Sequence, residues 1–174
     1  MTTNYQIVIN TPLGKMVAKS DENAVFALDF EDACHCRLDP QSVETQPIAA
    51  FNAITDRPNK ILLQLATEIE EYFASKRKTF SVPVRLQGTD FQVKAWQILQ
   101  QIPFGKTISY AEQAVLAGNK KAVRAVAGAN SKNKIVLLVP CHRVIGKNGA
   151  LTGFASGLWR KERLIELEKS VAHR

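Results

Sequence analysis

The chain has 174 residues, enough for one large domain or two small ones, and its 45% hydrophobic and 22% charged residues are ordinary values for a soluble globular protein. No apolar stretch approaches the roughly 18 residues that a membrane span needs, and the first residues lack the basic and apolar regions of a secretory signal. The net charge is +7, and we expect a cytoplasmic protein with no membrane partner.

The first half of the chain predicts a small sheet and a helix. Strand-prone runs at residues 5–9, 16–18 and 24–30 are separated by turn residues, which is typical of a meander. Residues 31–58 are polar and contain three prolines, so we expect a loop there. Apolar side chains then recur at helical spacing from Ile61 to Phe73, which predicts an amphipathic helix.

The second half predicts several short helices. Residues 89–92 have the form of a capping box, and the helix that follows should end before Pro103. Its predicted buried stripe is Phe91, Ala95, Ile98 and Leu99. A second capping box at residues 109–112 opens a helix to about Ala117, and a turn at Gly118 precedes a helix over residues 120–130. Two short helices joined by a glycine-containing turn are the outline of a helix-turn-helix.

These elements predict an α/β fold (α+β) with two domains. We expect an N-terminal sheet domain with a flanking helix over residues 1–87, and a mainly helical domain over residues 88–174. The first carries 9 Lys/Arg against 11 Asp/Glu, a net charge of −2, and the second carries 14 against 5, a net charge of +9. This asymmetry indicates a polyanion bound by the second domain, although a basic surface kept for solubility explains it equally well.

The second helix of the helix-turn-helix has an unusual outer face. Its inner face should hold Val123, Val126 and Ala127, and its outer face Lys121, Arg124, Ala125 and Gly128. Small residues beside two cations allow a close approach to a nucleic-acid groove. The alternative is an alanine-rich helix packed against the rest of the protein.

Cys141 follows an uninterrupted apolar run, residues 135–139, which predicts a strand buried on both faces. Pro140 ends that strand, so Cys141 should lie where a core strand gives way to a turn. A thiol is mostly protonated at neutral pH, and a nearby base such as His142 raises its reactive thiolate fraction. The alternatives are a packed, inert cysteine and a histidine that caps the turn.

Glu168 is a possible partner for His142. It follows Leu164 by four residues and Ile165 by three, on the apolar stripe of the last predicted helix. A carboxylate that faces a core is costly unless it is hydrogen-bonded or paired, so the sequence supplies a possible Cys-His-Glu relay. The alternative is a carboxylate at a frayed helix end.

The three cysteines, Cys34, Cys36 and Cys141, are an odd number in a chain without a recognisable signal, so we expect reduced thiols and no disulfide framework. Residues 34–36, Cys-His-Cys, are metal-ligating types, but their adjacent spacing is not that of a structural zinc site. We therefore predict no metal site and no cofactor.

The segment Pro140-Cys141-His142-Arg143-Val144 resembles the active-site motif of the O6-alkylguanine-DNA alkyltransferases (methylated-DNA–protein-cysteine methyltransferases). The resemblance extends in order over essentially all of residues 88–174, and more weakly over the N-terminal meander. It includes Phe91-Gln92, Ile102-Pro103-Phe104-Gly105, Ile108-Ser109-Tyr110, Leu116-Ala117-Gly118-Asn119, Arg124-Ala125-Val126, Thr152-Gly153-Phe154-Ala155, Leu158 and residues 161–168.

The resemblance implies a role for each matching residue. Cys141 would accept the alkyl group, His142 would act as base through a water, and Glu168 would complete the relay. Asn133 would organise the active-site turn, and Tyr110 would support nucleotide rotation and protonate the departing guanine. The implied pocket residues are Tyr110, Val144, Phe154, Ala155 and Ser156, and the implied DNA-binding residues are Arg124, Lys121, Ala125, Gly128 and Ser109, with Arg124 entering the base stack.

The implied reaction is DNA repair by irreversible transfer of an alkyl group from O6-alkylguanine, and from O4-alkylthymine, to Cys141, once per protein molecule. The implied partner is double-stranded DNA, bound by a monomer through the minor groove, with the damaged nucleotide flipped out. The sequence departs from the family pattern at Ser156, where Gly is expected, and at Phe154, where Tyr is more usual. Neither departure removes a catalytic group, but both leave the range of alkyl groups open.

Two other functions are compatible with part of the pattern. A non-enzymatic DNA-binding regulator would use the helix-turn-helix, but it leaves Cys141, His142 and Glu168 without a purpose. A cysteine hydrolase would need an oxyanion hole and would turn over repeatedly, and it does not explain the basic outer helix face.

Overall fold

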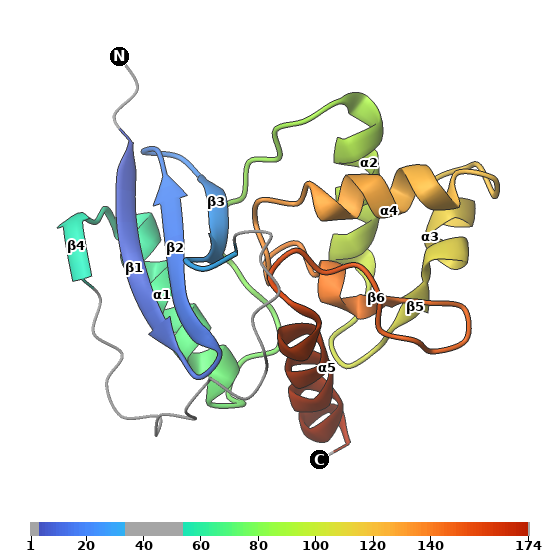
Figure 1. The fold of residues 1–174 in the computed structure, drawn as a ribbon. Helices are drawn as coiled ribbons and strands as arrows, with labels where there is room; N and C mark the ends of the chain where they lie inside the picture. The colour runs from blue at the N-terminus through green and yellow to red at the C-terminus, as the bar shows by residue number, and fades with distance from the viewer. Residues whose placement is uncertain (1–3, 34–53, 174) are drawn as a thin grey trace. The chain divides into compact units, whose positions relative to one another are not determined.

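The computed structural model describes residues 4–33 and 54–173 of the chain. The chain forms two compact units, Met1–Arg85 and Leu86–Arg174 (Figure 1), which divide two residues before the boundary predicted from the sequence. The first unit holds a sheet and one long helix and the second is mainly helical, so the predicted α/β fold class is confirmed. Within the described ranges, no helix combines the length and apolar character that crossing a bilayer requires.

The first unit contains a four-stranded antiparallel sheet in the order β3-β2-β1-β4. The predicted meander is confirmed as β1 (Tyr5–Thr11), β2 (Gly14–Ser20) and β3 (Val25–Phe30). The loop predicted for residues 31–58 is wrong at its end, because β4 (Ile54–Arg57) pairs with β1. A four-residue strand has little pattern of its own and forms because a distant edge is open to it, which local sequence does not reveal.

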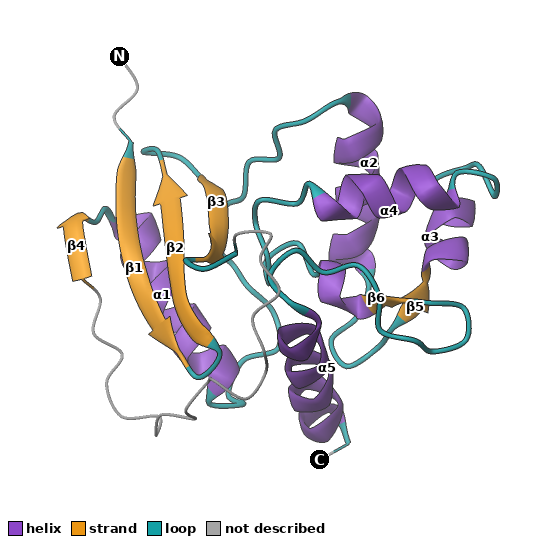
Figure 2. Cartoon of the chain, in the orientation of Figure 1, coloured by secondary structure: helices purple, strands orange, loops and turns teal. Residues whose placement is uncertain are grey.

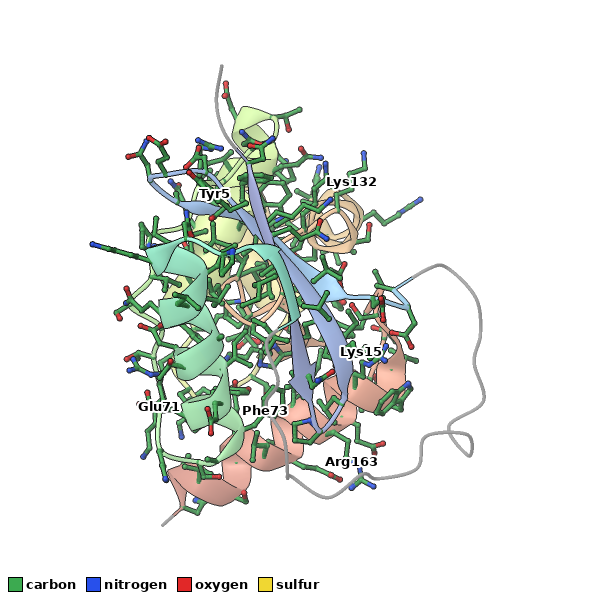
Figure 3. The ribbon with its side chains drawn as sticks, turned by 90° about the vertical axis from the view of Figure 1, so that its left-hand side faces the viewer. Tyr5, Lys15, Glu71, Phe73, Lys132 and Arg163 are labelled. Atoms are coloured by element: carbon green, nitrogen blue, oxygen red, sulfur yellow. The ribbon has the colours of Figure 1, made fainter. Side chains whose placement is uncertain are left out.

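Helix α1 (Lys60–Phe73) lies against one face of the sheet (Figure 2). It begins at Asn59, whose side chain accepts a hydrogen bond from the Leu62 N–H group, 2.9 Å away. Glu71 lies on the side of α1 away from the strands, whereas Phe73 points toward them (Figure 3). The buried face is mainly apolar, as predicted, and comprises Leu62, Leu65, Glu68, Ile69, Tyr72 and Phe73.

The end of the first unit is fixed to the edge of β3. The Val25 N–H group donates to the Pro83 carbonyl, and the Arg85 N–H group donates to the Val25 carbonyl, each at 2.9 Å. The Arg85 guanidinium forms an ion pair with Asp21, whose side chain is 1% exposed. The segment that leads out of the sheet unit is therefore held by backbone and side-chain bonds within that unit.

The second unit is built from short helices. Both predicted capping boxes are confirmed, at Thr89 before α2 (Asp90–Gln101) and at Ser109 before α3 (Tyr110–Leu116). Helix α4 (Val123–Ser131) begins three residues later than predicted. The Asn119 side chain accepts a hydrogen bond from the Lys121 N–H group at 3.0 Å, which holds the preceding residues in a turn.

Helices α2, α3 and α4 pack around a buried polar pair. Gln113 on α3 and Asn130 on α4 exchange hydrogen bonds of 3.1 Å and 2.7 Å through their side-chain amides, and the Trp96 indole donates to the Ala129 carbonyl at 2.9 Å. The inner face of α4 is Val126, Ala129 and Asn130, so the prediction was right for Val126 but not for Val123 and Ala127, which are only partly buried. These bonds fix α4 against its two neighbours, α2 and α3.

The strand predicted for residues 135–139 is wrong. The segment is buried as expected, but it forms a tight turn in which the Val139 N–H group donates to the Ile135 carbonyl at 2.9 Å and Leu137 has a φ of 70°. Asn133 closes this turn from inside, accepting from the Ile135 N–H group at 3.0 Å and donating to the Val139 carbonyl at 2.7 Å. An apolar run without a period does not distinguish a buried strand from a buried turn.

Two short strands and the last helix complete the unit. β5 (Ile108–Ser109) pairs in parallel with β6 (Val144–Ile145), which places the residues after the cysteine turn beside those that open α3. A single 3-10 turn, η2 (Cys141–Arg143), precedes β6, and α5 (Leu158–Ala172) packs against η2 (Figure 1). The candidate site lies among these elements.

Candidate active site

Cys141 is the first residue of η2 and its side chain lies in the interior, with the residue 6% exposed. The Asn133 side-chain amide donates to the Cys141 sulfur at 3.3 Å as well as to the Val139 carbonyl. One amide therefore fixes both the turn that leads to the cysteine and the sulfur itself. A hydrogen bond to sulfur stabilises a thiolate more than a neutral thiol.

His142 faces α5, where its Nε2 atom lies 2.8 Å from Oε1 of Glu168, and both residues are about 1% exposed. A carboxylate only accepts hydrogen bonds, so Nε2 carries the hydrogen and Nδ1 holds the lone pair. Nδ1 is buried and has no hydrogen-bond partner among the described residues. Burial lowers the pKa of His142, opposed by Glu168, so the imidazole is a neutral acceptor at pH 7.

Glu168 is held by four donors. Besides His142, the Nε and Nη2 atoms of Arg143 lie 2.9 Å from its two oxygens, and the Gly105 N–H group donates to Oε2 at 3.0 Å. Burial alone would raise the pKa of Glu168, but the hydrogen bonds and charges of His142 and Arg143 lower it to about 2. The carboxylate is therefore a fixed negative charge that orients the imidazole, and it does not exchange protons at neutral pH.

Tyr110, the first residue of α3, lies 9% exposed with its hydroxyl 3.0 Å from the Thr152 carbonyl and 3.2 Å from the Gly153 carbonyl. Lys161 on α5 also donates to the Thr152 carbonyl, at 2.5 Å, and its ammonium lies 5.6 Å from the centre of the Tyr110 ring. The Cys141 sulfur interacts electrostatically with both groups. The structure thus brings Tyr110 and Lys161 together with Cys141.

Burial changes the acidity of both groups. It raises the pKa of Tyr110, and a thiolate at Cys141 raises it further. Burial lowers the pKa of Lys161 to about 8, a change that the same thiolate opposes. A fully buried lysine beside a phenol and a thiol is therefore close to its own titration point near neutral pH, where it can act as a charge or as a proton donor.

The site contains two residues that were not predicted from the sequence, Arg143 and Lys161. Lys161 precedes Glu168 by seven residues, so it lies two turns away on the same face of α5. The test that singled out Glu168, a charged residue on the apolar stripe, would also have found Lys161. Arg143 gave no such signal, because a cation after a turn is usually solvated.

The residues predicted to line the base pocket differ in exposure. Val144 and Ser156 are buried, Phe154 is partly buried and Ala155 is exposed. Gly153 has a φ of +60°, and a Cβ atom there would lie 2.7 Å from the Tyr110 hydroxyl oxygen, so this position requires glycine. The Ser156 carbonyl accepts from Arg160 at 2.8 Å, which ties the segment to the first turn of α5.

The predicted outer face of α4 is confirmed as a surface. Arg124, Ala125 and Gly128 on α4 are exposed, and a Cβ atom added at Gly128 would meet nothing within 4 Å. Lys121 is also exposed, but it lies in the turn two residues before α4 begins and not on the helix as predicted. Ser109 is partly buried at the start of α3, and its hydroxyl accepts from the Glu112 N–H group at 3.1 Å, so it acts as a helix cap.

No group of three or more histidine, cysteine or acidic side chains that could hold a metal ion occurs in residues 4–33 and 54–173. The sequence segment Cys34-His35-Cys36 lies outside the described residues.

Two family models match the chain. The DNA binding domain of 6-O-methylguanine DNA methyltransferase matches residues 90–170, and the ribonuclease-like domain of the same family matches residues 4–86. The constitutive methylated-DNA–protein-cysteine methyltransferase of Bacillus subtilis is 42% identical over 169 residues, which cover 95% of this chain and 96% of that protein. The corresponding protein of Methanosarcina acetivorans is 38% identical, with 95% and 99% covered.

Solved structures show the same similarity. The crystal structure of Mycobacterium tuberculosis O6-methylguanine methyltransferase matches with a TM-score of 0.76 and 35% identity, covering 97% of this chain and 94% of that one. The structure of Mycobacterium tuberculosis OGT in complex with DNA matches with a TM-score of 0.76 and 36% identity, covering 94% and 92%. On both sequence and structure, the chain belongs to the 6-O-methylguanine DNA methyltransferase family.

Proposed function

We propose that this protein repairs O6-alkylguanine in double-stranded DNA by transferring the alkyl group to Cys141, once per protein molecule. Family membership makes the chain a DNA-repair enzyme, a methylated-DNA–protein-cysteine methyltransferase. The observation that supports Cys141 as the acceptor is its place in one buried turn with His142, beside the Asn133 amide. The regulator and the hydrolase considered above leave this family membership unexplained.

The first step is activation of the thiol. The Cys141 proton passes through a water molecule to Nδ1 of His142, the ring nitrogen that does not face Glu168. The imidazolium that forms is stabilised by the carboxylate 2.8 Å from Nε2. The Asn133 amide, 3.3 Å from the sulfur, then stabilises the thiolate.

The second step is displacement at the alkyl carbon. The thiolate forms a new sulfur–carbon bond while the bond between that carbon and guanine O6 breaks, and its electron pair goes to the base. Tyr110 donates a proton to the departing guanine, which improves it as a leaving group. The proton held by His142 then returns to the tyrosinate through water, so that one proton passes in net from the thiol to the base. The positive charge of Lys161 favours the thiolate, and since it lies 5.6 Å from the centre of the Tyr110 ring it favours the tyrosinate as well.

The product explains why each molecule acts once. A thioether at Cys141 has no proton to lose, and removing its alkyl group would require the thiolate to leave carbon, for which it is a poor leaving group. The other cysteines of the sequence, Cys34 and Cys36, would not reverse it, because thiol exchange acts on disulfides and not on thioethers. O4-alkylthymine carries an alkoxy group beside a ring nitrogen in the same way, and we include it as a second substrate.

The outer face of α4 is the proposed DNA-binding surface. Its exposed small residues, Ala125 and Gly128, allow the helix to enter the minor groove, and Lys121 supplies positive charge for the phosphates. Arg124 would occupy the stack from which the damaged nucleotide has flipped, offsetting an unstacking cost of a few kcal/mol. The protein would bind as a monomer, with the sheet unit supporting the second unit.

The proposal is tested by counting transfers. A duplex that contains one O6-methylguanine is incubated in tenfold excess over the protein, and repaired DNA is quantified by chromatography. We expect repair to stop at one lesion per protein molecule and to vanish in Cys141→Ala. The matched control, Cys34→Ala/Cys36→Ala, should repair normally. Repair beyond one equivalent, or repair by Cys141→Ala, would contradict the proposal.

A further inference from the structure

Arg143 is a buried arginine, 7% exposed, and its side chain hydrogen-bonds to partners within the second unit. Its Nε and Nη2 atoms each lie 2.9 Å from one oxygen of Glu168, and its Nη1 atom donates to the Ile102 carbonyl at 2.6 Å. Its guanidinium carbon also lies 5.8 Å from the centre of the Phe104 ring. This two-pronged contact matches the flat fork of a guanidinium, which a lysine cannot reproduce.

The carboxylate held by Arg143 is the one that orients His142. Arg143 and the Gly105 N–H group supply three hydrogen bonds to it, so the plane of the carboxylate is fixed without any help from the imidazole. His142 then meets a carboxylate that is already oriented. As a result Nε2 is directed to α5, and Nδ1 is left as the accepting nitrogen.

The charge of Arg143 matters as much as its geometry. Three charged groups act on His142: Glu168 and Lys161 from α5, and Arg143 from η2, while Cys141 is its neighbour in the chain. A buried carboxylate without a counter-charge would attract a proton onto the imidazole and hold it there. Arg143 supplies that counter-charge. An imidazole that is already protonated could not take the proton of a thiol.

We propose that Arg143 is a positioning residue for alkyl transfer, which keeps His142 neutral and correctly oriented by holding and neutralising Glu168. This inference rests on the proposed function of Cys141 and His142. It assigns Arg143 an effect on the pH dependence of the reaction, and not only on the stability of the fold.

The pH dependence of the transfer rate tests the proposal. Transfer from an O6-methylguanine duplex is measured with protein in excess, from pH 5 to pH 9, for the unmodified protein and for Arg143→Gln. In the pH–rate profile of Arg143→Gln, we expect the fall of the rate on the acidic side to begin about one pH unit higher, so that the rate near pH 5 falls up to about tenfold more than the rate at pH 8.5. An equal loss at every pH would show a merely structural role and overturn the proposal.

Two further variants separate charge from geometry. The double variant Arg143→Gln/Glu168→Gln also removes the carboxylate charge. The acidic side of its pH–rate profile should therefore move back to lower pH. Arg143→Lys keeps the positive charge but loses the two-pronged contact with Glu168. The acidic side of its pH–rate profile should therefore stay in place while its maximal rate falls. A profile of Arg143→Lys whose acidic side moves as far as that of Arg143→Gln would contradict the electrostatic part of the proposal.

A measurement on the unmodified protein keeps the proposal testable even if Arg143→Gln does not fold. The chain has three histidines, and the carbon-13 ring signals of His142 are identified by comparison with His35→Asn and His173→Asn. The pKa of His142 should lie below the ordinary histidine value, so its ring should be neutral at pH 7. A protonated His142 at pH 7 would overturn the inference. Failure of methyl transfer at pH 7.5 would contradict the proposed function instead, and the charge state of His142 would still be measured independently of transfer.

Discussion

The side-chain amide of Asn133 donates to the sulfur of Cys141, 3.3 Å away, across a turn that the same amide closes. The two residues lie eight positions apart in the chain, and the segment between them is almost wholly buried. Both the position and the reactivity of Cys141 therefore depend on one polar side chain, that of Asn133, in an apolar segment.

Replacing Asn133 with Ala should lower both stability and transfer rate. The change leaves the Val139 carbonyl and the Ile135 N–H group buried without their partner, at a cost of about 1–3 kcal/mol each. It also removes the donor to sulfur. Urea unfolding and single-turnover rates measure the two effects. Asn148→Ala, in the exposed turn after β6, is the matched control and should change little; a normal rate in Asn133→Ala would remove this residue from the mechanism.

Glu168 should contribute stability in a defined pH range. Its pKa is lowered from 4.5 to about 2 in the folded protein, so the unfolded chain binds a proton more readily than the folded one between these values. The contribution is therefore complete above pH 4.5 and is lost as the pH falls through about 2. It is on the order of 3 kcal/mol.

Urea unfolding of the unmodified protein and of Glu168→Gln, from pH 7 to pH 3, tests this prediction. The difference between their free energies of unfolding should be largest near neutral pH and should shrink below pH 4.5. A difference that stays constant over the range would mean that Glu168 is not held as a carboxylate.

Arg124→Ala should separate DNA repair from the chemistry. Arg124 is exposed on α4, and in the described part of the chain it makes no contact with the groups around Cys141. The variant should therefore react normally with free O6-benzylguanine. Its repair of O6-methylguanine in a duplex should fall by about tenfold or more, because flipping loses its support. Arg163→Ala, another exposed arginine, is the control. Equal losses on both substrates would contradict a role in flipping.

Ser156→Gly should widen the range of alkyl groups. The Ser156 side chain is buried in the segment predicted to form the pocket wall, and the family pattern has Gly at this position. Removing the hydroxymethyl group should raise the rate with O6-benzylguanine relative to O6-methylguanine. Ala155→Gly changes an exposed neighbour and should leave this ratio unchanged. An unchanged ratio in Ser156→Gly as well would place Ser156 outside the pocket.

Sequence patterns predicted the parts of this fold that local chemistry decides. The capping boxes at Thr89 and Ser109 were identified from four residues each, because all of their hydrogen bonds close within the first helical turn. Glu168 was identified because a carboxylate on an apolar helical stripe needs a partner. These predictions required no knowledge of the distant chain.

The features that were missed depend on distant partners. The turn at Leu137 was predicted to be a strand, since the Asn133 side chain that closes the turn lies outside the apolar run. Arg143 received no role from the sequence, because its partners lie 25 and 41 residues away at Glu168 and Ile102. Such contacts are set by tertiary packing, which a pattern in one segment does not contain.

The measurement that tests the central claim most directly is the position of the transferred group. The protein is incubated with a duplex that contains O6-methylguanine, digested, and analysed by peptide mass spectrometry. We predict one added methyl group per molecule, about 14 Da in a single peptide, located on the sulfur of Cys141, with the DNA converted to guanine. An unmodified Cys141 peptide beside repaired DNA, or a methyl group on another residue, would contradict the account.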